Sequence, residues 1–462
     1  MHWPRALVVW LLIALAESLH GVLRTLLVTP VLGDLAARQL GVLIGSGLIF
    51  AISVATVRWM GARTLRQQLG IGTAWAALML AFEIGLGIAL GLDAARLTAD
   101  YDPGRGGYMA FGMAFLVAAP ALAARARQVR SRGHGLRRAA WLAAGFAVLV
   151  AAAWVVLAFQ RDLRAAEARI SGISRIAVTA CGPIEYVSVG DGPTLLAVHG
   201  AGGGFDQVLG ALQPLTGAGL RVIAMSRFGY LGTPLPVDAS AAAQADAHAC
   251  LLDALGIDRA AVLGASAGAP SALLFAERHP QRATALVLLV PALYVPRQGG
   301  EAPVSVPPGT RALFATALRF DFLFWAAPRL ARDAVLRGIL ATPPAVVAAA
   351  SPAEQARVAQ MIRQILPVRP RRQGMLNDAA VLADIGRYDL ESITTPTLLI
   401  SAEDDLFGTC AIARYTAEHL PDARLVSYAS GGHLWVGHHD AVLAEIVAFL
   451  RSPAIEPEVP GA

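Results

Sequence analysis

The residues best suited to chemistry are a serine between two glycines and, later in the chain, two aspartates and a histidine. Ser266 lies in VLGASAGAP, where Gly264 and Gly268 complete a G-x-S-x-G pattern between an apolar run and a helical one. The same small residues also fit a turn that only lets two elements pack closely. A serine hydroxyl is a weak nucleophile at neutral pH, so a catalytic role requires a base and an acid that orients the base.

Candidates for both partners follow Ser266 in the chain. The apolar run TPTLLIS leads into AEDDLFG, which contains Asp404 and Asp405, and the run RLVSYAS leads into GGHLW, which contains His433. A serine on a strand-to-helix turn is accompanied by partners in the chain order serine, acid, histidine. That order is present, so the pattern favours a catalytic serine over a packing turn. The order alone leaves the acid open between the two aspartates.

The elements that would position these residues are short apolar runs separated by helical stretches. Runs that fit buried strands lie at 194–199, 221–226, 260–265, 285–290, 395–401 and 424–430. A hairpin around 181–183 precedes them, and helical stretches such as 241–255 and 267–278 lie between them. This alternation predicts a doubly wound, mostly parallel sheet with helices on both faces. Loops at the carboxyl ends of such strands carry the chemistry, and all three candidate segments lie there.

Residues 170–452 resemble the α/β-hydrolase family. The segments that carry the resemblance are HGAGGG, SRFGYLGTP, GASAG, AEDD and GGH. It implies Ser266 as nucleophile, His433 as general base and Asp405 as the residue that orients the base, with Asp404 as the alternative acid. Serine at the turn argues against the dehalogenase and epoxide hydrolase branches, which resemble this fold but use aspartate there.

The resemblance also implies how substrate would be held. The backbone N–H groups of Ala201 and Ala267 would form an oxyanion hole, and the glycine-rich loop that contains Gly202 would let the backbone approach the substrate closely. The insert at about 292–392 looks like a helical cap. Its aromatic residues, among them Phe320, Phe324 and Trp325, are predicted to line an apolar pocket; the alternative is that they only pack the cap on the core.

The first third of the chain has a different composition. The hydrophobic fraction is 56% and the mean hydropathy +0.55, and the long apolar runs are concentrated before residue 160. Five segments have about the length that a bilayer requires, at 6–28, 39–58, 69–92, 107–124 and 139–159. We therefore expect an integral membrane module of about four spans over 1–125, a basic loop and fifth span over 126–165, a hydrolase domain over 166–452 and a disordered tail over 453–462.

The charges predict an orientation and exclude one class of partner. All basic side chains are arginines, and six of them crowd between the fourth and fifth segments, at 125, 127, 130, 132, 137 and 138. Flanked by apolar runs, this cluster indicates a cytoplasmic loop and not a nucleic-acid site. Five spans with the N-terminus inside then place the hydrolase domain outside the cytoplasm, and four spans would reverse that. The lysine-free, arginine- and alanine-rich composition indicates a bacterial source, and hence the bacterial plasma membrane.

The first apolar segment contains three ionisable residues, Glu17, His20 and Arg24, at spacings that place them on one helical face. Such groups are costly in hydrocarbon and should face the interior of the bundle. Glu83 in the third segment is a possible partner. Two interpretations stay open: a path for a proton, ion or small ligand, or a buried polar cluster that fixes helix packing.

The remaining composition adds little chemistry. Cys181, Cys250 and Cys410 show no CxxC or Cys/His metal spacing. We expect free thiols, with a disulfide as the alternative, and no metal or cofactor. The sequence thus predicts a membrane-anchored serine hydrolase that cleaves an ester or related acyl bond of an apolar small molecule. A C–C bond hydrolase or perhydrolase with the same triad is the rival among enzymes. A transport or sensing protein whose hydrolase-like domain only binds ligand is the rival from another class.

Overall fold

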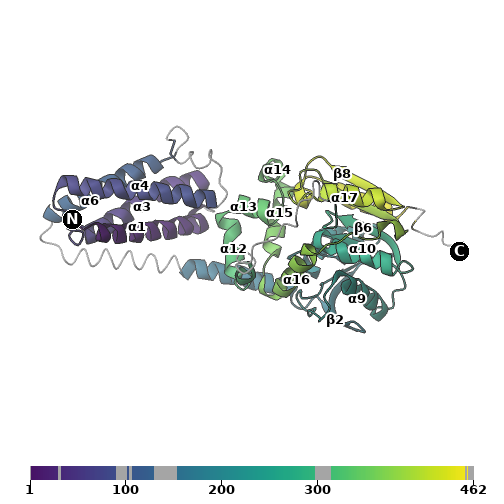
Figure 1. Cartoon of the computed structure of the whole chain (residues 1–462). Coiled ribbons are helices and arrows are strands. Elements are labelled where there is room, and N and C mark those ends of the chain that lie inside the picture. The colour runs from purple at the N-terminus through teal and green to yellow at the C-terminus, as the bar shows by residue number, and fades with distance from the viewer. Residues whose placement is uncertain are drawn as a thin grey trace. The chain divides into compact units, whose positions relative to one another are not determined.

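The computed structural model describes residues 2–29, 33–89, 101–102, 107–129, 153–296, 314–452 and 455. Contacts divide the chain into two compact units (Figure 1). One comprises Met1–Gln160 and Arg329–Ala334, and the other comprises Arg161–Pro328 and Val335–Ala462.

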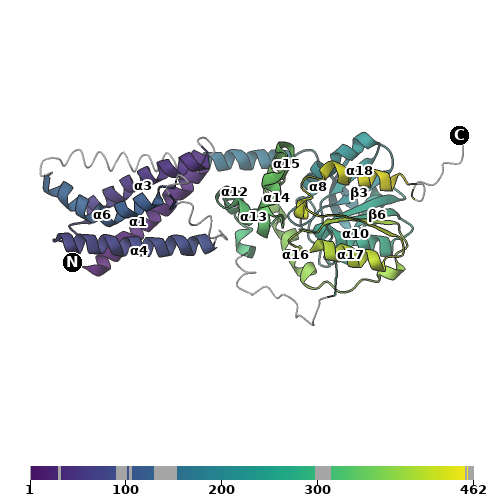
Figure 2. The ribbon, with the colours of Figure 1, turned by 90° about the horizontal axis from the view of Figure 1, so that it is seen from above.

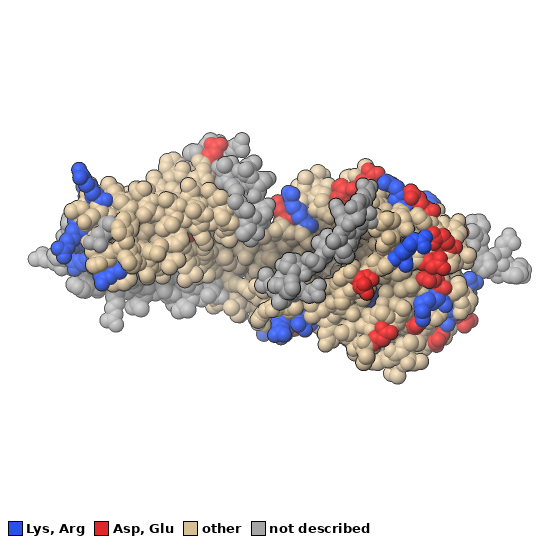
Figure 3. All heavy atoms as spheres, in the orientation of Figure 1, with Lys and Arg blue, Asp and Glu red and all other residues tan. Residues whose placement is uncertain are grey.

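Among the described residues, the first unit contains four long apolar helices: α1 (Trp3–Leu23), α3 (Asp34–Thr56), α4 (Leu65–Ala89) and α6 (Met109–Val129). Within the described residues, four helical stretches are long and apolar enough to cross a membrane, Trp3–Leu26, Asp34–Thr56, Leu65–Leu86 and Met109–Arg127. The space-filling view shows few charged side chains along these helices and many on the second unit (Figure 3). The predicted fifth span at 139–159 lies mostly outside the described residues, which begin again with a helix at 153–170.

The helices pack through close backbone approaches and buried aromatic side chains. A Cβ atom at Gly72 of α4 would lie 2.0 Å from the Val117 carbonyl oxygen of α6, so only glycine allows this approach. Trp75 is buried and donates from Nε1 to the Ala6 carbonyl oxygen of α1 at 2.8 Å. Pro120 lies inside α6, which continues past it.

The second unit contains one eight-stranded sheet in the order β1-β2-β4-β3-β5-β6-β7-β8. The strands are β1 (Arg175–Thr179), β2 (Gly182–Val189), β3 (Thr194–Val198), β4 (Arg221–Met225), β5 (Ala260–Ala265), β6 (Ala283–Leu289), β7 (Thr397–Ala402) and β8 (Ala423–Tyr428). β1 and β2 form the predicted hairpin, β2 pairs antiparallel with β4, and the pairs from β4 to β8 are all parallel. The prediction of a mostly parallel sheet is confirmed.

Helices cover both faces of this sheet (Figure 2). α8 (Phe205–Leu212) and α18 (His439–Leu450) pack on one face through one apolar core. α9 (Ala241–Ala254), α10 (Ala269–Arg278) and α17 (Thr409–His419) pack on the other face through a second core. Strands buried on both faces explain why the sequence shows continuous apolar runs instead of alternation.

The segment between β6 and β7 is helical where it is described. It contains α12 (Asp321–Leu330), α13 (Arg332–Gly338), α14 (Pro344–Ala349), α15 (Pro352–Gln364) and α16 (Arg372–Ala383). Residues 297–313 of the predicted cap, and all of the predicted tail at 453–462 except residue 455, lie outside the described residues.

The prediction of free thiols is wrong for two of the three cysteines. Cys181, in the turn between β1 and β2, forms a disulfide with Cys250 of α9, with Cα atoms 6.0 Å apart. Cys410 is a buried free thiol. Cysteine spacing does not reveal this bond, because the two cysteines are 69 residues apart and come together only when α9 packs beside the hairpin.

Candidate active site

The turn after β5 holds Ser266 in a backbone conformation that is uncommon for a residue with a side chain. Its φ is +50°, and it opens a short 3-10 turn that runs into α10. Both flanking glycines are required by close contacts. A Cβ at Gly264 would lie 2.6 Å from the Ala272 Cβ, and one at Gly268 would lie 2.6 Å from the His199 carbonyl oxygen. The turn is therefore the strained strand-to-helix elbow that the motif predicts, with strain concentrated at the serine.

Ser266, His433 and Asp405 form a continuous chain of hydrogen bonds. His433 Nε2 lies 2.9 Å from Ser266 Oγ, and His433 Nδ1 lies 2.8 Å from Asp405 Oδ2. Asp405 is buried, and its oxygens also accept from the Thr409 hydroxyl and, at 2.9 Å, from the Phe407 N–H. A carboxylate held in this way fixes the imidazole with a proton on Nδ1, which leaves Nε2 free to accept the serine proton.

The other aspartate has a different contact. Asp404 Oδ1 accepts a hydrogen bond from the Gly432 N–H at 2.7 Å, so it joins the loop after β7 to the loop that carries His433. The cap contributes to the same loop, since the His433 N–H donates to the Ala341 carbonyl oxygen at 3.3 Å. Of the two candidate acids, Asp405 therefore contacts the His433 ring, whereas Asp404 contacts the backbone N–H of Gly432.

Comparison with known proteins identifies the family. The family described as alpha/beta hydrolase fold matches residues 193–437, which is more than half of the chain. The chain belongs to the α/β-hydrolase family.

Several curated relatives are similar to the hydrolase domain. A pimeloyl-[acyl-carrier protein] methyl ester esterase from Aromatoleum aromaticum is 33% identical over 259 residues, which cover 55% of this chain and 98% of that protein. A 2-hydroxy-6-oxo-6-phenylhexa-2,4-dienoate hydrolase from Comamonas testosteroni is 34% identical over 113 residues, 23% of this chain and 40% of that protein. Among solved structures, an alpha/beta hydrolase fold protein from Nakamurella multipartita aligns at 29% identity and a TM-score of 0.44, over 60% of this chain and 99% of that chain.

In this α/β-hydrolase, the loop after β3 lies against the turn that carries Ser266. A Cβ at Gly200 would lie 3.2 Å from the Ser266 Cβ, so the two segments are in contact there. The predicted oxyanion-hole residues come directly after these positions, Ala201 after Gly200 and Ala267 after Ser266. Gly202, predicted to approach the substrate, has a φ of +70° and donates its N–H to the Tyr230 hydroxyl at 3.1 Å. Its amide is therefore already engaged in holding the loop.

A buried network that the sequence did not predict supports the same loop. Tyr230 also donates to Asp378 of α16, and Asp378 accepts two hydrogen bonds from Arg227, at 2.6 and 2.7 Å. Burial and the Asp378 carboxylate raise the pKa of Tyr230 well above its ordinary value, so the hydroxyl stays protonated. Burial and the nearby charge of Arg227 hold the pKa of His199 well below 6.5. The neutral His199 ring accepts a hydrogen bond at Nε2 from the backbone N–H of Arg227, at 3.0 Å.

A second buried ion pair reaches the loop from the cap. Arg371 is fully buried, binds Asp206 through two hydrogen bonds of 3.0 and 2.9 Å, and donates to the Gly203 carbonyl oxygen. Arg169 adds a hydrogen bond of 3.3 Å to the same aspartate. The glycine-rich motif could have drawn attention to Asp206, which lies two residues after Gly204. Its partner Arg371, however, is 165 residues later in the chain and belongs to no recognisable motif.

The three aromatic residues predicted to bind substrate have different surroundings. Trp325 is buried and donates from Nε1 to Asp162 Oδ2 at 2.9 Å, which places it against the helix at 153–170. Phe320 is 53% exposed, and Phe324 is partly buried. The aromatic residue beside His433 is instead Phe407, whose ring meets the His433 ring edge-on with the centroids 5.1 Å apart.

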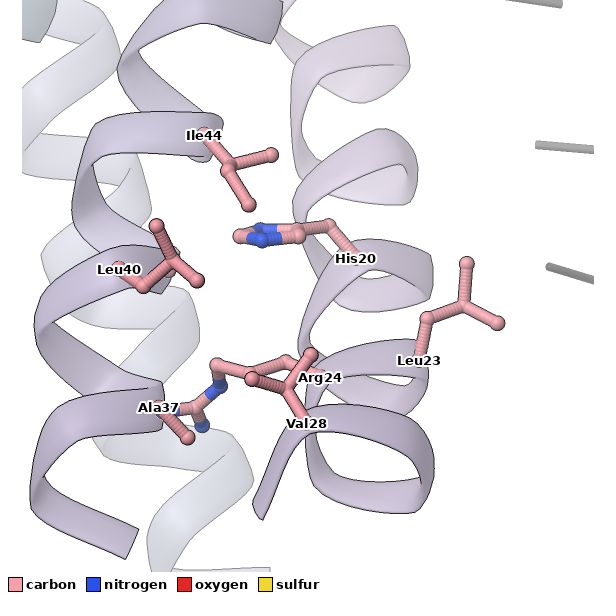
Figure 4. Close-up of a pocket in the computed structure, with 8 residues that line it drawn as sticks. His20, Leu23, Arg24, Val28, Ala37, Leu40 and Ile44 are labelled. Atoms are coloured by element: carbon pink, nitrogen blue, oxygen red, sulfur yellow. The ribbon is translucent and has the colours of Figure 1, made fainter. Parts of the chain in front are cut away.

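Two residues of the polar cluster in the first unit, His20 and Arg24, line a cavity between α1 and α3. His20 and Arg24 face Leu40 and Ile44 across a space of about 160 Å³ (Figure 4). His20 Nδ1 lies 3.4 Å from Glu17 Oε2. Two glycines of α3 make room for these side chains, since a Cβ at Gly45 would lie 2.5 Å from Glu17 Oε2 and one at Gly41 would lie 2.7 Å from Arg24 Cδ. The prediction that all three face a neighbouring helix agrees with this placement.

Proposed function

We propose that this protein is a membrane-anchored serine hydrolase that cleaves an ester bond of an apolar substrate. The observation that carries the proposal is the chain of hydrogen bonds from Ser266 through His433 to Asp405, with the serine on a strained elbow. The similarity to a methyl ester esterase along nearly the whole length of that relative supports ester cleavage as the reaction.

In the proposed mechanism, Ser266 Oγ attacks the ester carbonyl carbon while His433 Nε2 takes the hydroxyl proton. The resulting oxyanion is stabilised by the N–H groups of Ala201 and Ala267, and Asp405 stabilises the imidazolium. The imidazolium returns the proton to the leaving alkoxide, and an acyl-enzyme remains. Water, deprotonated by His433, then releases the acid and restores the Ser266 hydroxyl.

A C–C bond hydrolase with the same triad is the second candidate. It is supported by the similarity to a 2-hydroxy-6-oxo-6-phenylhexa-2,4-dienoate hydrolase, which extends over 113 residues and covers only 40% of that relative. Turnover of a panel of aryl and alkyl esters against vinylogous diketones separates the candidates. A preference for the diketones would replace the ester assignment.

The charges and the disulfide both support one side of the membrane for the hydrolase domain. In the five-span arrangement the cytoplasmic segments carry ten arginines and the outer loops carry three, which favours a hydrolase domain outside the cytoplasm. The bond between Cys181 and Cys250 supports the same side, because disulfides persist in oxidising compartments. We therefore place the chain in a bacterial plasma membrane with its hydrolase domain on the extracytoplasmic face.

One labelling experiment tests both parts of the proposal. Intact cells that express the full chain are treated with a membrane-impermeant fluorophosphonate probe, and Ser266→Ala serves as the control. We expect labelling of the wild-type chain, none of the variant, and a loss of about 10⁴-fold or more in esterase turnover. Retained labelling or turnover in Ser266→Ala would disprove the mechanism, and labelling only after lysis would reverse the orientation.

A further inference from the structure

Large apolar side chains are exposed at the start of helix α12 of the cap. Phe320, directly before the helix, is 53% exposed, and Phe322 and Leu323 in its first turn are 40% and 47% exposed. Asp321 is buried beside them and accepts from the Val368 N–H at 2.7 Å and from Arg369 Nε at 2.9 Å. Three neighbouring large apolar side chains at the surface mark a contact site, since their exposure to water is unfavourable.

The same stretch of α12 is attached to the helix at 153–170, because Trp325 lies one turn after Phe322, with the two ring centroids 5.6 Å apart. Trp325 Nε1 donates to Asp162, and this residue belongs to the helix at 153–170. Upstream in that helix, Trp154, Val156 and Leu157 are 52%, 54% and 67% exposed, as expected for side chains that face lipid. The first charges of the helix are at Arg161 and Asp162.

This attachment sets the height of α12 relative to a bilayer. The predicted fifth span ends at residue 159, and a helix rises 1.5 Å per residue, so Asp162 lies about 5 Å along the helix beyond the end of the span. A side chain bonded to Asp162 is therefore at the level of the lipid headgroups. Aromatic residues are favoured at this level, and arginines can bind the phosphates there.

The charges near α12 fit the same surface. Arg319, directly before Phe320, is exposed, whereas the neighbouring Asp321 is buried and neutralised by Arg369. The exposed start of α12 thus combines aromatic and aliphatic side chains with a positive charge, the combination that binds anionic bilayer surfaces. The rim of the catalytic site is also apolar, since Leu406 and Phe407 are 52% and 53% exposed.

We propose that α12 docks on the bilayer of the membrane to which the chain is anchored, with Phe320, Phe322 and Leu323 inserted among the headgroups. The substrates are then amphiphilic esters dissolved in that bilayer, delivered to Ser266 beneath the cap. This substrate class rests on the proposed hydrolase function, whereas the docking itself does not.

Docking is tested on the full chain in proteoliposomes of phosphatidylcholine and phosphatidylglycerol. Cys410→Ala removes the free thiol, and Leu323→Cys then carries an environment-sensitive fluorophore, with Val237→Cys, fully exposed in the wild-type chain, as the control site. We expect lipids spin-labelled near the headgroup to quench the probe at 323 and not the probe at 237. Equal quenching at 323 and 237 by a water-soluble quencher would overturn docking. So would a probe at 323 that neither quencher reaches, because that result indicates a protein contact such as a second copy.

Delivery is tested by activity. Arg319→Glu combined with Leu323→Asp should lower kcat/KM at least tenfold for a long-chain ester dissolved in the bilayer and leave a short water-soluble ester unaffected, whereas Val237→Asp should change neither value. Equal losses on both esters, or no loss, would overturn delivery from the bilayer. If the wild-type chain hydrolyses neither ester while the probe at 323 is still quenched by lipid, the proposed hydrolase function fails and the docking stands.

Discussion

Each half of the molecule contains a histidine beside a carboxylate. The two pairs differ in how many of their polar side-chain atoms have hydrogen-bond partners. In the hydrolase domain, His433 bonds to Asp405 at 2.8 Å and to Ser266 at 2.9 Å, so both ring nitrogens have partners. In the membrane module, His20 Nδ1 lies 3.4 Å from Glu17. Among the described residues, neither His20 Nε2 nor the second Glu17 oxygen has a hydrogen-bond partner.

The difference comes from how each pair is built. Glu17 and His20 share one helix, and a spacing of three residues places them on one face without fixing their separation or the direction of their lone pairs. Ser266, His433 and Asp405 come from three loops of one sheet edge, and each is held from several sides. Residue types and spacing can therefore nominate a site, but tertiary contacts decide whether its donors and acceptors are aligned for proton transfer.

The largest effect is expected from a substitution that breaks the hydrogen bond between Asp405 and His433. Asp405→Asn should lower kcat for an aryl ester about 10⁴-fold, because an amide beside Nδ1 no longer fixes the tautomer that lets Nε2 accept a proton. Asp404→Asn is the matched control, since its amide oxygen can still accept from Gly432. We expect less than a tenfold loss there, measured by steady-state kinetics. A larger loss for the Asp404 variant would transfer the role of the acid to that residue.

The next largest effect is expected on stability, from removal of the buried ion pair between Arg371 and Asp206 in the hydrolase domain. Arg371→Met should reduce the free energy of unfolding by about 3 kcal/mol, because Asp206 would lose its bidentate partner in the interior. Combining it with Asp206→Leu should recover much of the loss. Denaturant unfolding followed by fluorescence measures both variants in detergent. A single variant as stable as the wild type would show that this pair contributes little.

These contacts also mark the limit of what the sequence reveals. The sheet, the elbow and the loops that carry Asp405 and His433 were predictable because strand periodicity and the serine motif are local patterns. Arg371, Asp378 and the disulfide partner of Cys181 were not, because each contacts a segment from 69 to 168 residues away and nothing in the local pattern shows that contact. Trp325 was predicted to line the substrate pocket, and its bond to Asp162 depends on a tertiary contact of the same kind.

A third histidine extends the comparison to a ring without any carboxylate. His248 is fully buried, with Nε2 3.1 Å from Ser271 Oγ, and burial lowers its pKa from 6.5 to about 3. Between these pH values the unfolded chain binds a proton that the folded chain excludes. The stabilising effect of the neutral ring is therefore complete above pH 6.5 and is lost as the pH falls toward 3.

His248→Gln should reduce the slope of unfolding free energy against pH in this window by up to about 1.4 kcal/mol per pH unit. Denaturant titrations at several pH values between 7 and 4.5 measure the slope. His199 is unchanged in this variant, so some pH dependence remains. An unchanged slope would mean that His248 takes up a proton in the folded domain as readily as in the unfolded chain.

The smallest effect is expected at the incompletely bonded pair. Glu17→Gln should change the free energy of unfolding by about 1 kcal/mol or less, because one carboxylate oxygen has no partner among the described residues and a charge within a span is itself costly. Hydrolysis by the full chain should be unchanged, since Glu17 belongs to the other unit. Gly45→Val, which would place a side chain against Glu17, should destabilise the module more and serves as the packing control. If Glu17→Gln abolishes a cellular phenotype while stability and hydrolysis stay intact, the cluster carries a proton or ligand and the membrane module has a function of its own.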